Sequence, residues 1–232
     1  HMHLVGITDE EYFRVISPKV NAKFFPHPHY GLKGNKASLS ASKLNILISG
    51  KYDQYTFSDT NRLISCLITN NSDFIKNSFC FTFHGKGWSE VCSPLIDLGY
   101  NIKFAGWVDD YIDFISGFDI QLFPISVGSG TKGKVLDGLG NGLLCIGSDY
   151  AFENIAKSTE DFYVKYTRIE DIISILEDIK NSPKIYEDMV CRAHDVICEF
   201  HDGRKILYDI LKWCTTGEYN INKDSFYRLP LK

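Results

Sequence analysis

Short, uncharged apolar runs alternate with segments of helical periodicity through the middle of this chain, and this alternation constrains the fold more than any other feature of the sequence. The apolar runs predict strands at 44–49, 78–85, 101–106, 119–124, 143–148 and 161–166. Helical patterns between them predict helices at 59–71, 89–98, 109–117 and 132–141. Strands this uncharged are typical of a parallel sheet that is covered on both faces. The sequence therefore predicts a doubly wound α/β fold, which binds ligands at the carboxyl ends of its strands.

The segments on either side of this alternation set the expected domain boundaries. Residues 1–30 carry one helical pattern. Thr8 is its predicted N-cap, and Glu11 follows three residues later, which is the spacing of a capping box. Beyond residue 168 the pattern is helical, and the last stretch is loosely patterned. The expected pieces are residues 1–30, a linker or exposed loop at 31–43, a Rossmann-like domain at 44–167, closing helices at 168–214 and a C-terminal tail at 215–232.

The overall composition narrows the classes of function. Lys and Arg total 25 against 29 Asp and Glu, a net charge of −4. No basic excess marks a nucleic-acid-binding surface, so no nucleic-acid partner is expected. The seven cysteines are scattered without a Cys-x-x-Cys pair, which disfavours zinc and redox motifs and indicates a reduced, cytoplasmic protein. No apolar run reaches the ~18 residues that a transmembrane helix needs.

The densest chemical signal is a glycine-rich loop that follows a predicted strand and opens a predicted helix. Gly128 and Gly130 allow the backbone to turn tightly and to approach a ligand closely. The amides that follow would point outward at the positive end of the helix dipole, which is an anion site suited to a diphosphate. Lys134 adds a charge one turn into the helix, and Asp137 lies three residues further on the same face, where a carboxylate can accept ribose hydroxyls. The alternative interpretation is a turn that merely joins a strand to a helix, since short glycine motifs are weak signals.

The order and spacing of several motifs are similar to those of a known family. The chain contains FAGWVDDYIDFISGFDIQLFP followed by ISVGSGTKGKVLDGLGNGLLCIGSD, and ILISGKYD and FTFHGKG occur earlier in matching order. Together they resemble the C-terminal, nucleotide-sugar-binding domain of glycosyltransferase family 4 and its GT-B relatives, over residues 23–165 and the closing helices. The resemblance implies that this chain is the C-terminal half of a GT-B fold. Residues 1–30 would then be a remnant of the preceding domain and the interdomain hinge.

The resemblance also implies an activity for the whole protein. Relatives transfer a sugar from a nucleoside diphosphate to an acceptor in polysaccharide or glycoconjugate biosynthesis, with retention at the anomeric carbon and without a metal ion. The nucleotide sugar is the substrate, and no cofactor is implied. The acceptor-binding N-terminal domain of such enzymes is missing from this sequence, so we expect the fragment to lack full activity. Any peripheral membrane association would belong to the full-length protein.

The family's donor site can be carried over residue by residue. Asp137 takes the place of a glutamate that holds the ribose, and Lys51 falls where many relatives have a phosphate-neutralising arginine. The implied contacts with the donor diphosphate are Lys51, Gly128, Ser129, Gly130, Thr131 and Lys134. The implied nucleobase loop is Gly106, Trp107 and Val108, and the candidates for contact with the donor sugar are His84 and Glu153.

Two departures from the family pattern keep alternatives open. Relatives often have two glutamates eight positions apart. In this chain Ser129 stands at the first of these positions. Asp137 stands at the second, and its side chain is one methylene shorter than that of glutamate. The alternatives are a non-catalytic glycosyltransferase-like subunit that binds a partner protein, and a GT-B-like sugar-nucleotide epimerase or sugar-phosphate synthase. An NAD-type dehydrogenase is disfavoured because the first strand ends in SGKYDQ rather than in G-x-G-x-x-G. The catalytic residues stay unassigned.

Other residues with chemical potential are expected to be structural. His27 and His29 are two positions apart, so in an extended chain they point to opposite faces and make poor metal co-ligands; no metal site is expected. Cys145 lies within an apolar strand and is expected in the core. Asp109 and Asp110 are predicted to cap the short helix that they precede.

Overall fold

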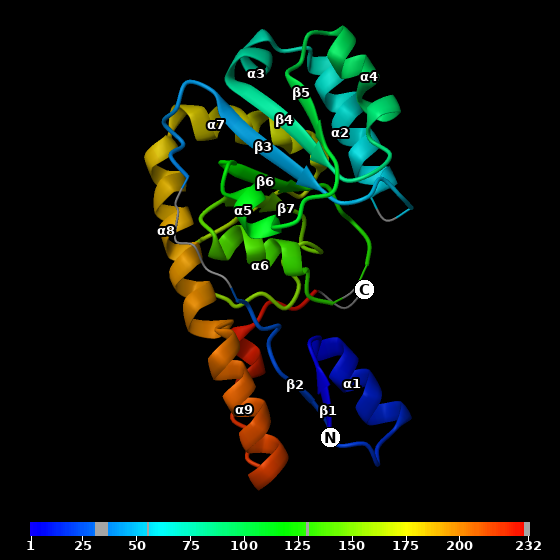
Figure 1. Ribbon diagram of the computed structural model, residues 1–232, viewed down its shortest axis with the longest axis vertical. Coiled ribbons are helices and arrows are strands. Elements are labelled where there is room, and N and C mark those ends of the chain that lie inside the picture. Colours follow the sequence, from blue (N-terminus) through cyan, green and yellow to red (C-terminus); the bar gives the residue numbers. More distant parts are fainter. Residues whose placement is uncertain (31–36, 55, 129, 230–232) are drawn as a thin grey trace.

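The computed structural model describes residues 1–30, 37–54, 56–128 and 130–229, and it confirms the predicted α/β fold with a parallel sheet (Figure 1). Six parallel strands lie in the order β5-β4-β3-β6-β7-β8. Their bounds are β3 (Leu44–Ser49), β4 (Phe79–His84), β5 (Ile102–Ala105), β6 (Ile120–Phe123), β7 (Leu144–Gly147) and β8 (Val164–Lys165). The chain adds β4 and β5 on one side of β3, then returns to add β6, β7 and β8 on the other side. This is the doubly wound topology, and its switch point lies between β3 and β6.

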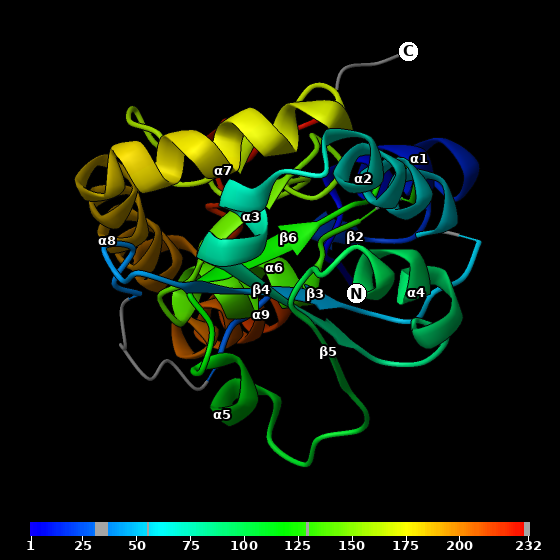
Figure 2. The ribbon, with the colours of Figure 1, turned by 90° about the horizontal axis from the view of Figure 1, so that it is seen from above.

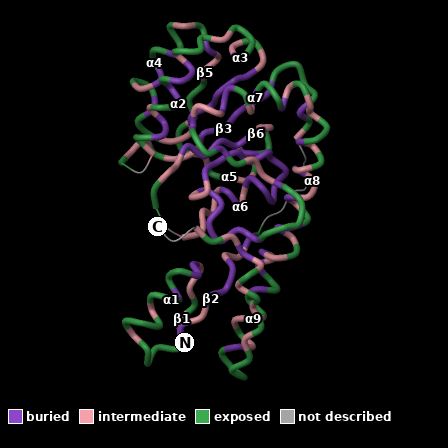
Figure 3. The backbone as a smooth tube through the Cα atoms, turned by 180° about the vertical axis from the view of Figure 1, so that it is seen from behind, coloured by how far each residue is buried: buried purple, intermediate pink, exposed green. Residues whose placement is uncertain are grey.

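Helices cover both faces of the sheet (Figure 2). One face packs against α2 (Phe57–Asn70), α3 (Asp73–Ser78), α4 (Ser89–Asp97) and α7 (Ile172–Asn181). The opposite face packs against α5 (Tyr111–Ile115), α6 (Gly133–Gly140) and part of α8 (Pro183–Phe200). Because both faces are covered, the strands are apolar on both sides, and all four residues of β6 and of β7 are buried. Figure 3 shows β3 and β6 in the buried centre of the molecule, whereas β5, at the edge of the sheet, is partly exposed.

A second, smaller unit lies beside the last helix, away from the main sheet (Figure 1). It consists of β1 (Met2–Leu4), α1 (Ile7–Ile16) and β2 (Ala22–Phe24), with β1 and β2 paired in parallel. Phe25, just after β2, packs with Ile206 and Trp213 of α9 (Gly203–Thr216). The N-terminal unit and α9 thus share a small apolar core of their own.

The predicted elements of the central region are all present, and two local differences have physical causes. Thr8 is not the N-cap of α1: Gly6 holds that position without a side-chain cap. The acceptor for the first helical amide comes instead from Asn154, whose Oδ1 lies 3.2 Å from the nitrogen of Ile7. Helix α3 falls between predicted elements, because its six residues are too short to show a helical period.

The segments expected to be loops contain buried side chains. Leu39 lies in the segment predicted as a linker or exposed loop, and it is fully buried; residues 31–36 of that segment lie outside the described part of the chain. The C-terminal tail forms a 3₁₀ turn at Lys223–Ser225 and buries Phe226 against the core. A second 3₁₀ turn, Ile169–Asp171, leads into α7. Among the described residues, no helix has both the length and the apolar character needed to cross a bilayer.

Candidate functional site

The carboxyl ends of β3, β4 and β6 meet at the switch point of the sheet. β3 ends at Ser49 and β4 ends at His84, and these two residues are register partners. The Ser49 hydroxyl and the Nδ1 atom of His84 lie 2.8 Å apart. The glycine-rich loop that follows β6 leads into α6 at the same edge. Open α/β sheets bind their ligands in this place, because the chain diverges here and leaves a crevice.

The glycine-rich loop has the backbone geometry that the sequence predicts. Gly128 has φ of 105° and Gly130 has φ of 78°, and a Cβ at either position would meet no atom within 4 Å. Glycine is therefore required here by backbone conformation, and the space in front of the loop is open. Ser129 lies outside the described residues.

The N-terminus of α6 has no side-chain cap. Lys132 is the N-cap residue, and its side chain makes no capping hydrogen bond. Its ammonium group instead contacts the Gly130 carbonyl oxygen at 2.5 Å and the Glu153 carboxylate at 3.4 Å. The Val135 amide already donates to the Lys132 carbonyl oxygen at 2.9 Å, which leaves the amides of Gly133 and Lys134 at the positive end of the helix dipole, where they suit an anion.

Lys134 and Asp137 lie on one face of α6, as predicted. Burial lowers the pKa of the Lys134 ammonium, and the nearby Asp137 carboxylate opposes that shift. The Lys134 Nζ also lies 5.6 Å from the centroid of the Tyr111 ring, within the range of a cation–π contact. Lys134 is therefore a partly buried cation, held between a carboxylate and an aromatic face.

Asp137 has a partner that the sequence does not reveal. The Nε2 atom of His29 lies 3.2 Å from Asp137 Oδ1, and the two residues are 108 positions apart. The His29 side chain is 3% exposed, and the Asp137 side chain is 27% exposed. The Asp137 carboxylate is thus held by the buried His29 ring, and the exposed part of the carboxylate can still bind a ligand.

Tyr111 connects α5 to the ends of β3 and β6 and to Lys134 of α6. Its hydroxyl accepts a 3.0 Å hydrogen bond from the Nε2 atom of Gln121, a fully buried residue of β6, and it also hydrogen bonds Ser49. Burial raises the pKa of Tyr111 to about 12, so the phenol stays protonated at neutral pH. Burial, together with the charge of Lys134, lowers the pKa of His84, so this imidazole is neutral. Sequence reasoning missed Tyr111 and Gln121, although a glutamine inside an apolar strand is a usable signal for a polar network.

The other predicted contact residues lie on the rim of the same edge. Lys51 is exposed in the loop after β3, and Gly106, Trp107 and Val108 form the loop between β5 and α5. The Trp107 side chain is 91% exposed, so it has a free ring face. Asp110 caps α5 as predicted, with its carboxylate accepting from the Asp113 amide at 2.8 Å.

Two predicted residues contact neighbouring segments. The hydroxyl of Thr131 donates to the carbonyl oxygen of Val5 at 2.8 Å, so the glycine-rich loop is tied to the N-terminal unit. The Glu153 carboxylate is 5% exposed and pairs with Lys132. Cys145 is fully buried in β7, as expected, and burial raises the pKa of its thiol.

Comparison with solved structures identifies the fold. HepE from Anabaena, solved with UDP and glucose, matches with a TM-score of 0.73 and 10% sequence identity over 92% of this chain and 62% of its own. TarM from S. aureus, in a complex that contains UDP, matches with a TM-score of 0.68 and 11% identity over 92% of this chain and 43% of its own. Sucrose-phosphate synthase from Thermosynechococcus elongatus gives a TM-score of 0.70 and 12% identity over 93% of this chain and 58% of its own.

The chain has the fold of a GT-B glycosyltransferase domain. No protein-family model and no curated protein matches the sequence, so the likeness lies in structure rather than in sequence. This GT-B-like chain spans less than two thirds of the length of each of these three proteins.

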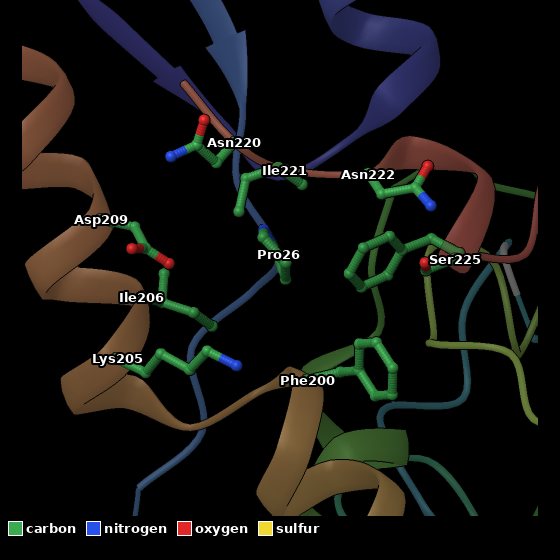
Figure 4. Close-up of a pocket in the computed structure, with 10 residues that line it drawn as sticks. Pro26, Phe200, Lys205, Ile206, Asp209, Asn220, Ile221, Asn222 and Ser225 are labelled. Carbon is green, nitrogen blue, oxygen red and sulfur yellow. The ribbon is translucent and has the colours of Figure 1, made fainter. Parts of the chain in front are cut away.

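A separate cavity lies away from the predicted site. Its volume is about 350 Å³, and it lies between the end of β2, the α8–α9 corner and the C-terminal tail (Figure 4). Apolar side chains such as Phe200 and Ile206 form part of its wall, and Lys205 and Asp209 of α9 lie along one side. None of the predicted donor-site residues lines this cavity. Within the described ranges, no group of three or more His, Cys, Asp or Glu side chains could hold a metal ion.

Proposed function

We propose that this chain is the donor-binding domain of a glycosyltransferase that takes a nucleoside-diphosphate sugar. The observation that carries the proposal is the convergence at the sheet's switch point of an uncapped α6 N-terminus, the cation of Lys134 and the carboxylate of Asp137. The helix N-terminus and Lys134 suit a diphosphate, and the Asp137 carboxylate suits the hydroxyls of a ribose. HepE and TarM were both solved with UDP, so UDP is the first nucleotide to test.

In this proposal the diphosphate binds the glycine-rich loop. The loop amides around Gly128, Gly130 and Thr131 donate to its oxygens, and Lys134 supplies the fixed cation, with Lys51 at the rim. Charge builds up on the diphosphate as the glycosidic bond to the sugar breaks, and preorganised donors of this kind stabilise it. The transfer proposed is retaining and needs no metal ion.

The other predicted residues are proposed to contact the nucleoside and the donor sugar. Asp137 accepts the ribose hydroxyls, and the Gly106–Val108 loop lies beside the base, where the exposed Trp107 ring is available for stacking. His84 and Glu153 are the residues proposed to face the donor sugar. Because Glu153 is paired with Lys132, it orients that lysine rather than acting as a free base.

The proposed whole protein adds an acceptor-binding domain built around the N-terminal unit. β1 and β2 pair only with each other among the described residues, and isolated two-stranded sheets are marginal on their own. Exposed apolar side chains lie on α1 and α9, namely Tyr12, Val15, Ile16, Leu207, Tyr208 and Leu211. We propose that the rest of an acceptor domain covers this surface. The protein would work in the cytoplasm on a polysaccharide or glycoconjugate acceptor, with any membrane contact made outside this chain.

Calorimetric titration with nucleoside diphosphates tests the proposal. UDP, GDP, CDP and ADP are titrated into the wild-type chain, into Lys134→Met and into Asp137→Asn. We expect one diphosphate to bind, and each substitution to weaken it at least tenfold, because hydrogen bonds to charged groups contribute about 1.5–3 kcal/mol.

A matched control comes from α8. Lys184 and Asp188 form an exposed ion pair with a 3.0 Å separation, far from the switch point in the fold. Lys184→Met and Asp188→Asn remove the same charges from a helix surface and should leave binding unchanged. A folded wild-type chain that binds none of the diphosphates would contradict the donor-binding proposal and favour a non-catalytic subunit.

A further inference from the structure

His29 lies in the segment that links the N-terminal unit to the main sheet, yet its ring reaches the proposed donor site. The segment follows β2 and includes two prolines, Pro26 and Pro28, which stiffen it. The His29 ring is almost completely buried, and its Nε2 atom lies 3.2 Å from Asp137 Oδ1. A connecting segment thus supplies a direct contact to the carboxylate of α6.

The backbone of His29 is held on both sides by the corner between α8 and α9. Its amide donates to the carbonyl oxygen of His201 at 2.8 Å, and its carbonyl oxygen accepts from the Gly203 amide at 3.1 Å. The Nδ1 atom of His201 contacts the carbonyl oxygen of His27 at 3.0 Å. Gly203 packs so closely on the ring of Tyr30 that a Cβ there would clash with it. The Cα position of His29 is therefore fixed by contacts that do not involve its ring.

The ring itself has one polar partner among the described residues. Its Nδ1 atom is buried without a hydrogen bond, so Asp137 alone orients the imidazole. A carboxylate oxygen can only accept, so the proton must lie on Nε2, and His29 donates to Asp137. The donated hydrogen bond holds one carboxylate oxygen, while the Asp137 side chain keeps 27% exposure towards the site.

We propose that His29 is a positioning residue for ribose recognition. It holds the Asp137 carboxylate in the orientation that accepts the ribose hydroxyls, and it thereby sets the preference for a ribonucleotide over a 2′-deoxyribonucleotide. Because His29 belongs to the segment between the two units, ribose binding is also coupled to the position of that segment. This inference rests on the proposed function of the Gly128–Asp137 region.

The test compares UDP with 2′-deoxy-UDP in calorimetric titrations. Wild-type protein should bind UDP about tenfold more tightly than 2′-deoxy-UDP, the effect of one hydrogen bond to a charged group. His29→Leu keeps a similar volume but cannot donate, so it should reduce this ratio towards one, mainly by weakening UDP. His29→Gln places an amide donor at a similar reach and should restore most of the ratio. In Asp137→Asn, the further change His29→Leu should have no additional effect on the ratio.

The outcomes distinguish failure of the proposed role of His29 from failure of the proposed donor-binding function. If wild-type protein prefers UDP and His29→Leu keeps that preference, the positioning role is overturned while the donor site stands. A loss of affinity for both nucleotides by the same factor in His29→Leu, without recovery in His29→Gln, also overturns it. If wild-type protein binds neither nucleotide, the proposed function itself fails.

A measurement on the unmodified chain covers the case in which His29→Leu does not fold. The imidazole nitrogen resonances of the wild-type chain are recorded by NMR. The resonances that disappear in His29→Gln are assigned to His29. UDP should shift the Nε2 resonance of His29 more than 2′-deoxy-UDP does. Equal shifts with both nucleotides would overturn the inference.

Discussion

His201 is fully buried at the end of α8, and both of its ring nitrogens contact backbone atoms of other segments. Nε2 accepts from the Ala156 amide at 3.2 Å, which leaves Nδ1 to donate to the carbonyl oxygen of His27. Burial, together with the smaller electrostatic effects of His27 and His29, lowers the pKa of His201 to about 4, although the hydrogen bond to the His27 carbonyl oxygen opposes this shift. The side chain therefore connects three segments only while its imidazole is neutral.

This arrangement predicts a loss of stability in mild acid. The folded pKa lies below the ordinary value of 6.5, so below pH 6.5 the unfolded chain binds a proton that the folded chain does not, down to about pH 4. The contribution of His201 to the free energy of unfolding should fall by about 3 kcal/mol across this window. Urea unfolding of wild-type protein and of His201→Gln between pH 7 and pH 4 measures the difference. Parallel pH profiles for the two proteins would show that His201 does not carry this dependence.

The individual residues that sequence reasoning found are those whose role depends on local backbone. Gly128 and Gly130 have the left-handed conformations expected of them, and Lys134 and Asp137 share a face because they are three apart on one helix. His29 and Tyr111 were not found, because their partners come from distant parts of the chain. Their contacts depend on how a connecting segment and a short helix pack, and no spacing along the chain records that.

At the scale of elements, the contact between α6 and the sheet places the proposed site. Gly138, one residue beyond Asp137, faces the strands, where a Cβ would lie 2.5 Å from the Oε1 atom of Gln121 and 2.8 Å from the Sγ atom of Cys145. Both neighbours belong to strands, β6 and β7, so neither can move away easily. The helix can approach the sheet because position 138 has no side chain.

Gly138→Ala should therefore destabilise the fold despite the better helix propensity of alanine. Overpacking of this kind costs about 1–3 kcal/mol, against a propensity gain of about 1 kcal/mol. Gly117→Ala is a control for adding a methyl group where there is room, because it lies just after α5 and a Cβ there meets only the Phe114 carbonyl oxygen at 3.7 Å. Chemical unfolding of both variants gives the comparison. Equal stability of the two proteins would show that α6 does not need this close approach.

Most elements could be predicted from the sequence because apolar runs and helical periods alternate cleanly between residues 44 and 166. Element ends were predicted less well where a distant residue decides them. Helix α1 begins at Ile7 because Asn154 supplies the acceptor, and the tail after α9 buries Phe226 although its sequence has no regular period. In both places tertiary contacts override the local pattern.

At the scale of the whole molecule, the N-terminal unit and α9 form a second body beside the main sheet (Figure 1). The N-terminal unit contacts the glycine-rich loop directly, since the Thr131 hydroxyl donates to the Val5 carbonyl oxygen. Several large apolar side chains on α1 and α9 are exposed, among them Val15 at 78% and Leu211 at 55%. The proposed acceptor domain would extend from this surface.

These exposed apolar side chains should promote association of the chain with itself. Val15→Lys combined with Leu211→Lys should reduce concentration-dependent self-association in sedimentation velocity. The same pair should change the free energy of unfolding by no more than about 0.5 kcal/mol, because these side chains are exposed. Ile185→Lys, at a residue of α8 that is 58% exposed, is the control and should leave association unchanged. A large loss of stability in the double variant would show that these side chains are part of the core.

The central claim is that the N-terminal end of α6, with Lys134 and Asp137, holds a nucleoside diphosphate. A crystal structure of the chain with UDP tests it most directly. The account predicts the diphosphate on the amides that open α6 and on Lys134, with the ribose hydroxyls about 2.5–3.0 Å from the Asp137 carboxylate. A diphosphate bound elsewhere, for example in the cavity beside Phe200 and Lys205, with the end of α6 empty, would contradict the account.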